Sequence, residues 1–147
     1  MRLQGTFKDN QDIDCQVVID VKDGVNTIVN IGSESSDIFF ADDDPVLIES
    51  VIEDTFQVVI TSSCTINLLT THYLGDQLFS ANARSARVNV RKAGKLIFAG
   101  FITPNIYTQP YNRKYDLLSI ECTDALATLQ YYKFQNAVDD DSYTNVK

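Results

Sequence analysis

Along most of this chain, apolar and polar residues alternate with a period of two, the spacing expected of β-strands that each bury one face. The clearest runs lie at 14–22, 25–32, 45–50, 55–63, 64–70 and 114–123, with two more within 84–102. Asp23-Gly24 separates the first two runs and is a strong local signal for a β-hairpin. The pattern predicts a mainly β fold, an antiparallel barrel or sandwich.

One late segment departs from this period. Residues 123–134, "TDALATLQYYKF", have the composition of a helix. Thr123 or Asp124 can cap its first turn, and Leu126 and Leu129 share one face that we expect to point inward. We therefore predict one C-terminal α-helix that starts at Asp124 and plugs an end of the barrel. A shorter helical turn is expected within 72–83.

The length of 147 residues suits one domain with a real core. We assign residues 1–134 to that domain and the polar residues 135–147 to a tail or linker. No apolar run approaches the roughly 18 residues of a helical membrane span, and residues 1–11 lack the apolar core of a signal peptide. We expect assembly in the cytoplasm.

Three cysteines, Cys15, Cys64 and Cys122, have no CxxC spacing and lie among apolar or β-branched neighbours. We interpret them as buried thiols in a reducing compartment rather than as a disulfide or metal site.

Charge is unevenly distributed along the chain. Residues 1–83 carry 3 basic and 14 acidic side chains, residues 84–114 carry 7 basic and none acidic, and residues 115–147 carry 2 basic and 6 acidic. The three balances of −11, +7 and −4 sum to the net charge of −8. A chain divided this way can present opposite potentials on different surfaces and so favour head-to-tail association. Folding can also intermix these charges, and the sequence alone leaves both interpretations open.

The basic stretch at 83–102 reads as a β-hairpin with five Lys and Arg residues and no Asp or Glu. A type I turn over Lys92-Ala93, followed by Gly94 in a left-handed bulge, avoids a positive φ at Ala93 and pairs Arg91 with Lys95. This register gives a core face made of Val88, Val90, Leu96, Phe98, Gly100 and Ile102.

The other face of the hairpin combines cations with apolar side chains: Arg87, Asn89, Arg91, Lys95, Ile97, Ala99 and Phe101. A face left in water should be polar throughout. Long Arg stems cover some apolar surface. Cover by another subunit is the alternative, with the guanidinium groups meeting the acidic face of a neighbour. We hypothesise that this hairpin lies at an assembly interface.

Candidate sites for chemistry are weak. His72 could be drawn with Ser62 or Ser63 and an Asp as a triad, but no G-x-S-x-G context supports one. The acidic runs at 41–45 and 138–142 lack the spacing of a calcium loop. We predict no catalytic, metal or cofactor site. Basic residues beside aromatics also resemble a sheet that binds single-stranded nucleic acid, although the net charge opposes that function.

Three segments of the chain resemble the N-terminal domain of tail or baseplate hub proteins of bacteriophages and prophages. They are "LQGTFKDNQDIDCQVVID", "SSCTINLLTTHYLGDQLFSANARSARVNVRKAGKLIFAGFITP" and "YDLLSIECTDALATLQYYKF". The shared elements are a V-x-V-x-x-x-G-K-x-I-F-x-G hairpin and a later strand that ends in C-x-D-x-L-x-x-L. The likeness runs from about residue 3 to residue 134. Hub proteins are usually much longer, so the resemblance implies that this chain is one excised or separately encoded domain.

The resemblance implies a non-enzymatic, tube-like β-barrel in a virion tail. Copies would form a trimeric or hexameric ring that joins the tail tube to a spike or tip protein and lets DNA pass without specific binding. The acidic excess would then line or rim the lumen. The residues expected at subunit contacts are Arg84, Arg87, Arg91, Lys95 and Phe101. The alternatives are a single-stranded nucleic-acid-binding β domain and a carbohydrate-binding tail-tip module.

Overall fold

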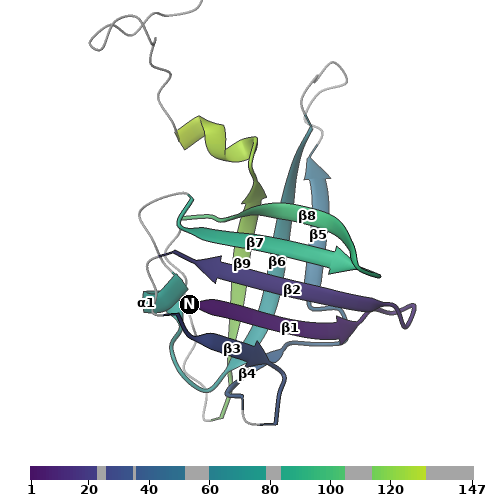
Figure 1. The fold of residues 1–147 in the computed structure, drawn as a ribbon, viewed down its shortest axis with the longest axis vertical. Helices are drawn as coiled ribbons and strands as arrows, with labels where there is room; N and C mark the ends of the chain where they lie inside the picture. Colours follow the sequence, from purple (N-terminus) through teal and green to yellow (C-terminus); the bar gives the residue numbers. More distant parts are fainter. Residues whose placement is uncertain (23–25, 35, 52–59, 79–83, 105–113, 132–147) are drawn as a thin grey trace, which may run out of the picture.

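The computed structural model describes residues 1–22, 26–34, 36–51, 60–78, 84–104 and 114–131. Within them the chain forms a nearly closed, eight-stranded mixed barrel, with a ninth strand paired to one side (Figure 1). The strands are β1 (Arg2–Lys8), β2 (Asp14–Val21), β3 (Ile28–Ile31), β4 (Ile38–Phe40), β5 (Val46–Val51), β6 (Thr61–Thr70), β7 (Ala86–Lys92), β8 (Lys95–Ile102) and β9 (Asp116–Asp124). The mainly β prediction is confirmed.

The order of the strands around the barrel is β3-β1-β2-β7-β8-β9-β6-β4. In Figure 1, β1, β2, β7 and β8 form a near layer, and β9, β6 and β5 cross behind it at a steep angle. β8 passes from one layer to the other because its end, Gly100–Ile102, pairs with β9. β4 and β5 pair one after the other with the same edge of β6, and β9 takes the opposite edge.

The predicted hairpin between 14–22 and 25–32 is wrong. One edge of β2 pairs with β1 and the other with β7, so no edge is left for β3. β3 instead lies parallel to β1, which makes the barrel mixed rather than wholly antiparallel. The residues of the expected turn, 23–25, lie outside the described residues. A strong turn signal therefore does not decide which strands pair, because two other strands occupy the edges of β2.

The core is built from alternate side chains of the strands, as the period of two predicts. In β2 these are Cys15, Val17 and Ile19, and in β9 they are Leu118, Ile120 and Cys122, all buried. Each fully buried aliphatic side chain contributes roughly 1.5–3 kcal/mol of transfer free energy.

The predicted break between 63 and 64 is wrong, because β6 runs without interruption from Thr61 to Thr70. Most of the predicted strand at 55–63 lies outside the described residues.

The β7–β8 turn differs from the expected one. Lys92 pairs with Lys95, so the turn has two residues, and both Ala93 (φ 49°) and Gly94 (φ 77°) are left-handed, as in a type I′ turn. The bulge lies one step further on, where Val90 pairs with Phe98 but Arg91 pairs with Leu96. This shift turns Leu96 out of the core, and its side chain is 47% exposed. The other five predicted core positions of the hairpin are buried.

The predicted helix at 123–134 is also wrong over the described residues, which contain no α-helix of seven or more residues. β9 continues through Thr123 and Asp124 because they pair with Ser63 and Gly100, and only a 3-10 helix, Ala127–Tyr131, follows. Leu126 and Leu129 are 52% and 55% exposed, so they do not plug the barrel. The expected helical turn within 72–83 is confirmed as α1 (Gly75–Leu78).

Candidate subunit interface

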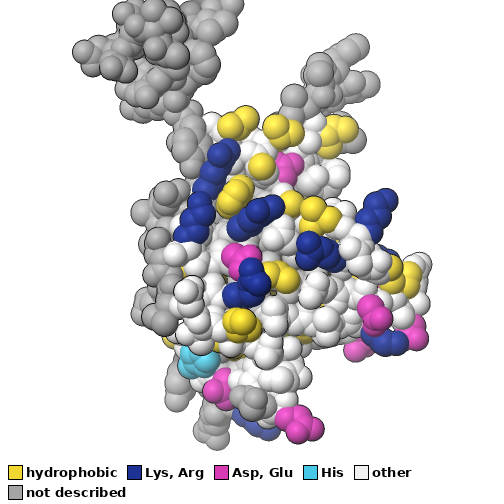
Figure 2. Space-filling view, in the orientation of Figure 1, with side chains coloured by type: hydrophobic (Ala, Val, Ile, Leu, Met, Phe, Trp, Pro, Cys, Tyr) yellow, Lys and Arg dark blue, Asp and Glu magenta, His cyan; other side chains and the backbone are white. Residues whose placement is uncertain are grey.

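The outward side of β7 and β8 carries the predicted combination of cations and apolar side chains. We call it the basic face and define it by Arg87, Arg91, Lys95, Leu96, Ile97 and Phe101. Arg87, Arg91 and Lys95 are exposed, Ile97 is 45% exposed, and Phe101 is half-buried. Figure 2 shows Lys and Arg side chains beside hydrophobic ones on this side of the molecule.

Three of the predicted contact residues gather at one end of the basic face. Arg87 and Phe101 are direct cross-strand partners. The guanidinium of Arg84 lies 5.7 Å from the centroid of the Phe101 ring, within the range of a cation–π contact. Its Nε donates a hydrogen bond of 3.2 Å to Oγ1 of Thr128, which is almost fully buried. Arg84 is thus held within its own chain, in contact with Phe101 and Thr128.

The other two predicted residues, Arg91 and Lys95, lie near the β7–β8 turn. Arg91 pairs with Leu96, so a cation and an exposed aliphatic side chain are neighbours there too. Lys92 is different, because it lies on the inward side of β7 and forms an ion pair with Asp9. Arg87, Arg91 and Lys95 therefore lie on the outward face, as predicted, whereas Lys92, which the sequence places in the turn, ends β7 instead.

A row of charges crosses the basic face from β1 to β7. Arg2, Asp20 and Arg87 occupy successive cross-strand positions. Arg2 Nε lies 2.6 Å from Asp20 Oδ1, and this hydrogen bond raises the pKa of Arg2. Among the described residues, Arg87, Arg91 and Lys95 form no ion pair, and Asp20, the cross-strand neighbour of Arg87, pairs with Arg2.

The far layer carries the opposite combination. Its outward positions on β5 and β9 include Leu47, Glu49, Leu117 and Glu121, which we call the acidic face. Leu47 and Leu117 are 54% and 44% exposed, and both Glu residues are exposed. Leu47, Thr65 and Glu121 form one cross-strand row. No Lys or Arg occurs within β5, β6 or β9.

Sequence reasoning did not identify the residues of the acidic face. The alternation within 45–50 and 114–123 shows which side chains share a face of one strand, and it does place Glu49 with Leu47. It does not show that β5 and β9 lie on either side of β6, which only the sheet order provides.

The described residues do not bring a catalytic triad together. His72 is exposed in the loop after β6, and its backbone N–H donates to Oγ1 of Thr70 (3.2 Å). Ser62 and Ser63 lie near the other end of β6, about 25 Å from Thr70 at roughly 3.3 Å per residue. The described part of the chain also holds no group of three or more His, Cys, Asp or Glu side chains arranged for a metal ion.

The three cysteines are buried and free, which confirms their interpretation as buried thiols. Cys64 and Cys122 are cross-strand partners on β6 and β9. Burial raises the pKa of Cys64 to about 12 and that of Cys122 well above its usual value. Neither thiol is therefore ionised near neutral pH. A nucleophile or metal ligand would need the ionised thiolate.

No helix within the described ranges is long and apolar enough to cross a membrane. Comparisons of the chain with protein-family models, with curated proteins and with solved structures found no match.

Proposed function

We propose that this chain is a structural domain of a phage tail hub whose copies associate head to tail, the basic face of one copy against the acidic face of the next. One observation supports this proposal above the others. Arg87 and Arg91 lack ion-pair partners in the described structure. Arg91 lies beside the exposed aliphatic side chain of Leu96, and Arg87 lies beside the half-buried ring of Phe101.

Both halves of this mixed surface favour a protein partner. Covering exposed apolar surface contributes roughly 25 cal/mol per Å². Opposite charges across the contact set its orientation and speed up association, more than they add affinity. Because the two faces belong to different layers of the barrel, a contact between them is heterologous, and such contacts generate closed rings or open filaments.

The ring size and the tail partners follow from the resemblance to hub domains. A trimer or hexamer would place this barrel in a ring that joins the tail tube to a spike or tip. The net charge of −8 is compatible with DNA passing through such a ring without being held, since acidic walls repel phosphate.

Charge reversal on the basic face tests the contact. The double variant Arg87→Glu/Arg91→Glu should lose the oligomer, because two acidic faces would meet, while the monomer keeps its circular dichroism spectrum and cooperative unfolding. Native mass spectrometry across a concentration series measures this. The control Lys8→Glu/Lys22→Glu makes the same change in net charge at exposed residues outside the face. A wild-type chain that stays monomeric at every concentration, or an unchanged oligomer in the double variant, would contradict the proposal.

A complementary variant identifies the partner surface. Glu49→Lys/Glu121→Lys should also fail to assemble alone, because it presents basic charge on both faces. Mixed with Arg87→Glu/Arg91→Glu, it should restore an oligomer in which the two variants alternate. Alternation around a closed ring requires an even number of copies, so a hexamer is restored and a trimer is not. Failure of the mixture to form any contact would rule out the acidic face as the partner surface.

Single-stranded nucleic acid is the second candidate, because Arg87 lies beside an aromatic ring on a sheet. The Phe101 ring is half-buried, however, and the guanidinium of Arg84 already lies over it, where a base would stack. An electrophoretic shift assay with a single-stranded oligonucleotide at physiological salt separates the two functions: the hub proposal expects no tight complex.

A further inference from the structure

A cavity of about 580 Å³ opens where the barrel is incompletely closed. It lies between β3 on one side and the start of β4, the loop after β6 and α1 on the other. β3 and β4 are the two ends of the strand order. One backbone hydrogen bond links the connection after β3 to β4, from Gly32 N–H to the Ile38 carbonyl (2.8 Å). The cavity lies next to this bond. We call this incompletely closed part of the barrel, between β3 and β4, the seam.

The backbone of β3 presents unused hydrogen-bonding groups to this seam. β3 is parallel to β1, and Arg2 N–H donates to the Thr27 carbonyl (2.8 Å). In this register the N–H groups of Val29 and Ile31 point to β1, and those of Ile28 and Asn30 point the other way. Within the described residues, no hydrogen bond engages the outward N–H groups of Ile28 and Asn30. β3 is therefore an edge strand with donors that face the cavity.

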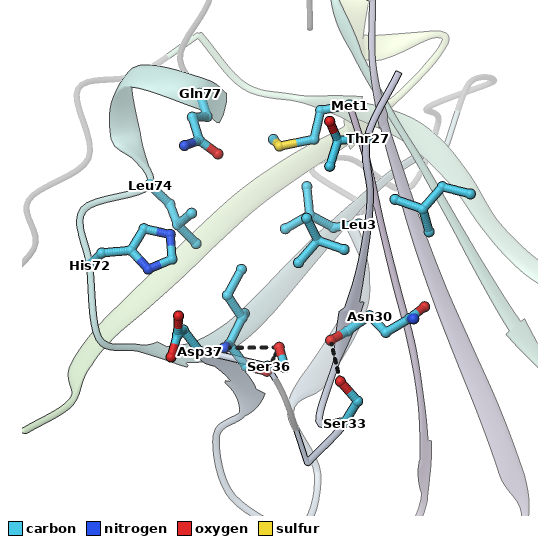
Figure 3. A pocket seen from close by; sticks show the side chains of 13 residues that line it. Met1, Leu3, Thr27, Asn30, Ser33, Ser36, Asp37, His72, Leu74 and Gln77 are labelled. Atoms are coloured by element: carbon cyan, nitrogen blue, oxygen red, sulfur yellow. Dashed lines mark hydrogen bonds between the residues drawn. The ribbon is translucent and has the colours of Figure 1, made fainter. Parts of the chain in front are cut away.

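The floor of the cavity is apolar and its rim is polar. Figure 3 shows Leu3 and Leu74 pointing into it from different elements, with His72, Asp37, Ser33 and Gln77 around them. Leu3, Leu74 and Ile38, which also lines it, are almost fully buried, and the exposed apolar surface of the cavity comes from Met1, Ile28 and Val29. Such a floor accepts one aliphatic or aromatic side chain, and the edge of β3 supplies main-chain hydrogen bonds next to it.

The charges around the seam favour a basic occupant. Asp37 lines the cavity, and Glu34 is exposed in the connection between β3 and β4. No Lys or Arg side chain is among the lining residues, and the amino group of Met1 donates to the Val21 carbonyl (3.1 Å).

We propose that this seam binds an extended segment of a partner protein as an added strand beside β3, with one apolar side chain on the floor and a Lys or Arg near Asp37. The segment continues the sheet through the N–H groups of Ile28 and Asn30 and narrows the opening of the barrel. This binding mode does not depend on the hub proposal, since the basic and acidic faces contribute none of the lining residues.

A displayed library of random linear dodecapeptides tests this inference. Selection on the wild-type chain should enrich peptides with an apolar residue flanked by Lys or Arg. An enriched peptide should slow hydrogen exchange at the Ile28 and Asn30 amides. Ile28→Pro removes the outward N–H without touching the β1–β3 hydrogen bonds. The affinity for the enriched peptide should fall about tenfold, the usual effect of one lost hydrogen bond plus a steric clash.

The matched control is Ser50→Pro. By the register of β5 with β6, the N–H of Ser50 also points away from its neighbour, at an edge distant in the strand order from the seam. Ser50→Pro should bind the peptide like the wild type, and Asp37→Asn should weaken it and reduce the dependence of affinity on salt. No enrichment over an Ile28→Pro bait, or equal affinity for wild type and Ile28→Pro, would overturn the inference. Slowed exchange only at the basic face would overturn it as well.

Discussion

The carboxylate of Asp9, in the β1–β2 turn, forms an ion pair with the ammonium group of Lys92, at the end of β7. The same carboxylate accepts hydrogen bonds from the backbone N–H groups of Ile13 (2.9 Å) and Gln11 (3.0 Å). Its side chain is only 9% exposed. One carboxylate thus orders its own turn and fastens it to a strand that is distant in the sequence.

This arrangement predicts a specific pH dependence of stability. The bond from Lys92, followed by the backbone bonds, lowers the pKa of Asp9 from 3.8. A carboxyl with a lower pKa in the folded state stabilises the fold above its unfolded-state pKa, and the contribution is lost as the pH falls through the folded-state value. The difference in free energy of unfolding between wild type and Asp9→Asn should therefore be constant above about pH 5 and shrink below about pH 4.

Urea denaturation at several pH values between about 2 and 7 measures this difference. Asp12→Asn is the control, because Asp12 lies in the same turn and pairs with Lys8 in an exposed ion pair. Exposed pairs contribute little, so this variant should match the wild type at pH 7. A constant difference between wild type and Asp9→Asn down to pH 2 would contradict the assignment.

The β7–β8 turn predicts a stabilising substitution. Ala93 has a φ of 49°, which costs energy in a residue with a Cβ, whereas Asn tolerates this region and Asn-Gly favours the type I′ turn. Ala93→Asn should raise the free energy of unfolding by about 0.5–1 kcal/mol. Ala93→Val, which is β-branched, should lower it. If urea denaturation shows both variants less stable than wild type, the turn is not type I′.

Local patterns sufficed for most of the strands and for the exposure of the basic face. Val88, Val90 and Phe98 alternate with Arg87, Asn89 and Arg91, and the structure buries the first set. Such alternation depends on each strand alone. The partner of β3, the bulge that exposes Leu96 and the extension of β9 through Asp124 depend on which edges other strands occupy, and no local pattern carries that information.

Helix propensity failed for a related reason. The Ala and Leu residues of 123–134 favour a helix weakly, but pairing of Thr123 with Ser63 and of Asp124 with Gly100 extends the strand into that segment. Tertiary pairing outweighs propensity there. The seam cavity was missed altogether, because β1, β3, β4 and α1 contribute to it from separate parts of the chain.

Close approach of two strands makes Gly100 intolerant of any side chain. A Cβ at this position would lie 2.2 Å from the Thr123 carbonyl oxygen and 2.7 Å from the Phe98 ring. The oxygen belongs to the backbone of β9 and cannot move without disturbing the β8–β9 pairing. Gly100→Ala should therefore lower the free energy of unfolding by at least about 2 kcal/mol. Gly94→Ala, which meets no atom within 4 Å and only strains φ, should cost about 1 kcal/mol.

The buried thiols predict slow chemistry in the folded state. With a pKa of about 12 and almost no exposed surface, Cys64 has neither thiolate nor access for a reagent. At pH 8, a chromogenic disulfide reagent should react with Cys64 and Cys122 only as fast as the chain opens, and all 3 thiols should react at once in guanidinium chloride. Rapid native labelling of Cys64, located by peptide mapping, would contradict the packing of β6 against β9.

The carboxylate of Asp124 joins the start of β6 to the 3-10 helix after β9. Replacing this side chain should therefore change both the overall stability and the local hydrogen exchange of the two segments. Oδ2 accepts the Ser62 N–H (2.6 Å), and Oδ1 accepts the Ala127 N–H (2.8 Å). Asp124→Ala loses both bonds and leaves two backbone donors without this partner, so the free energy of unfolding should fall by about 1–3 kcal/mol. Asp124→Asn keeps one acceptor oxygen and should cost less. Hydrogen exchange at the Ser62 and Ala127 amides should accelerate in the Ala variant and less in the Asn variant. Equal exchange in all three proteins would mean that Asp124 does not hold these two segments together.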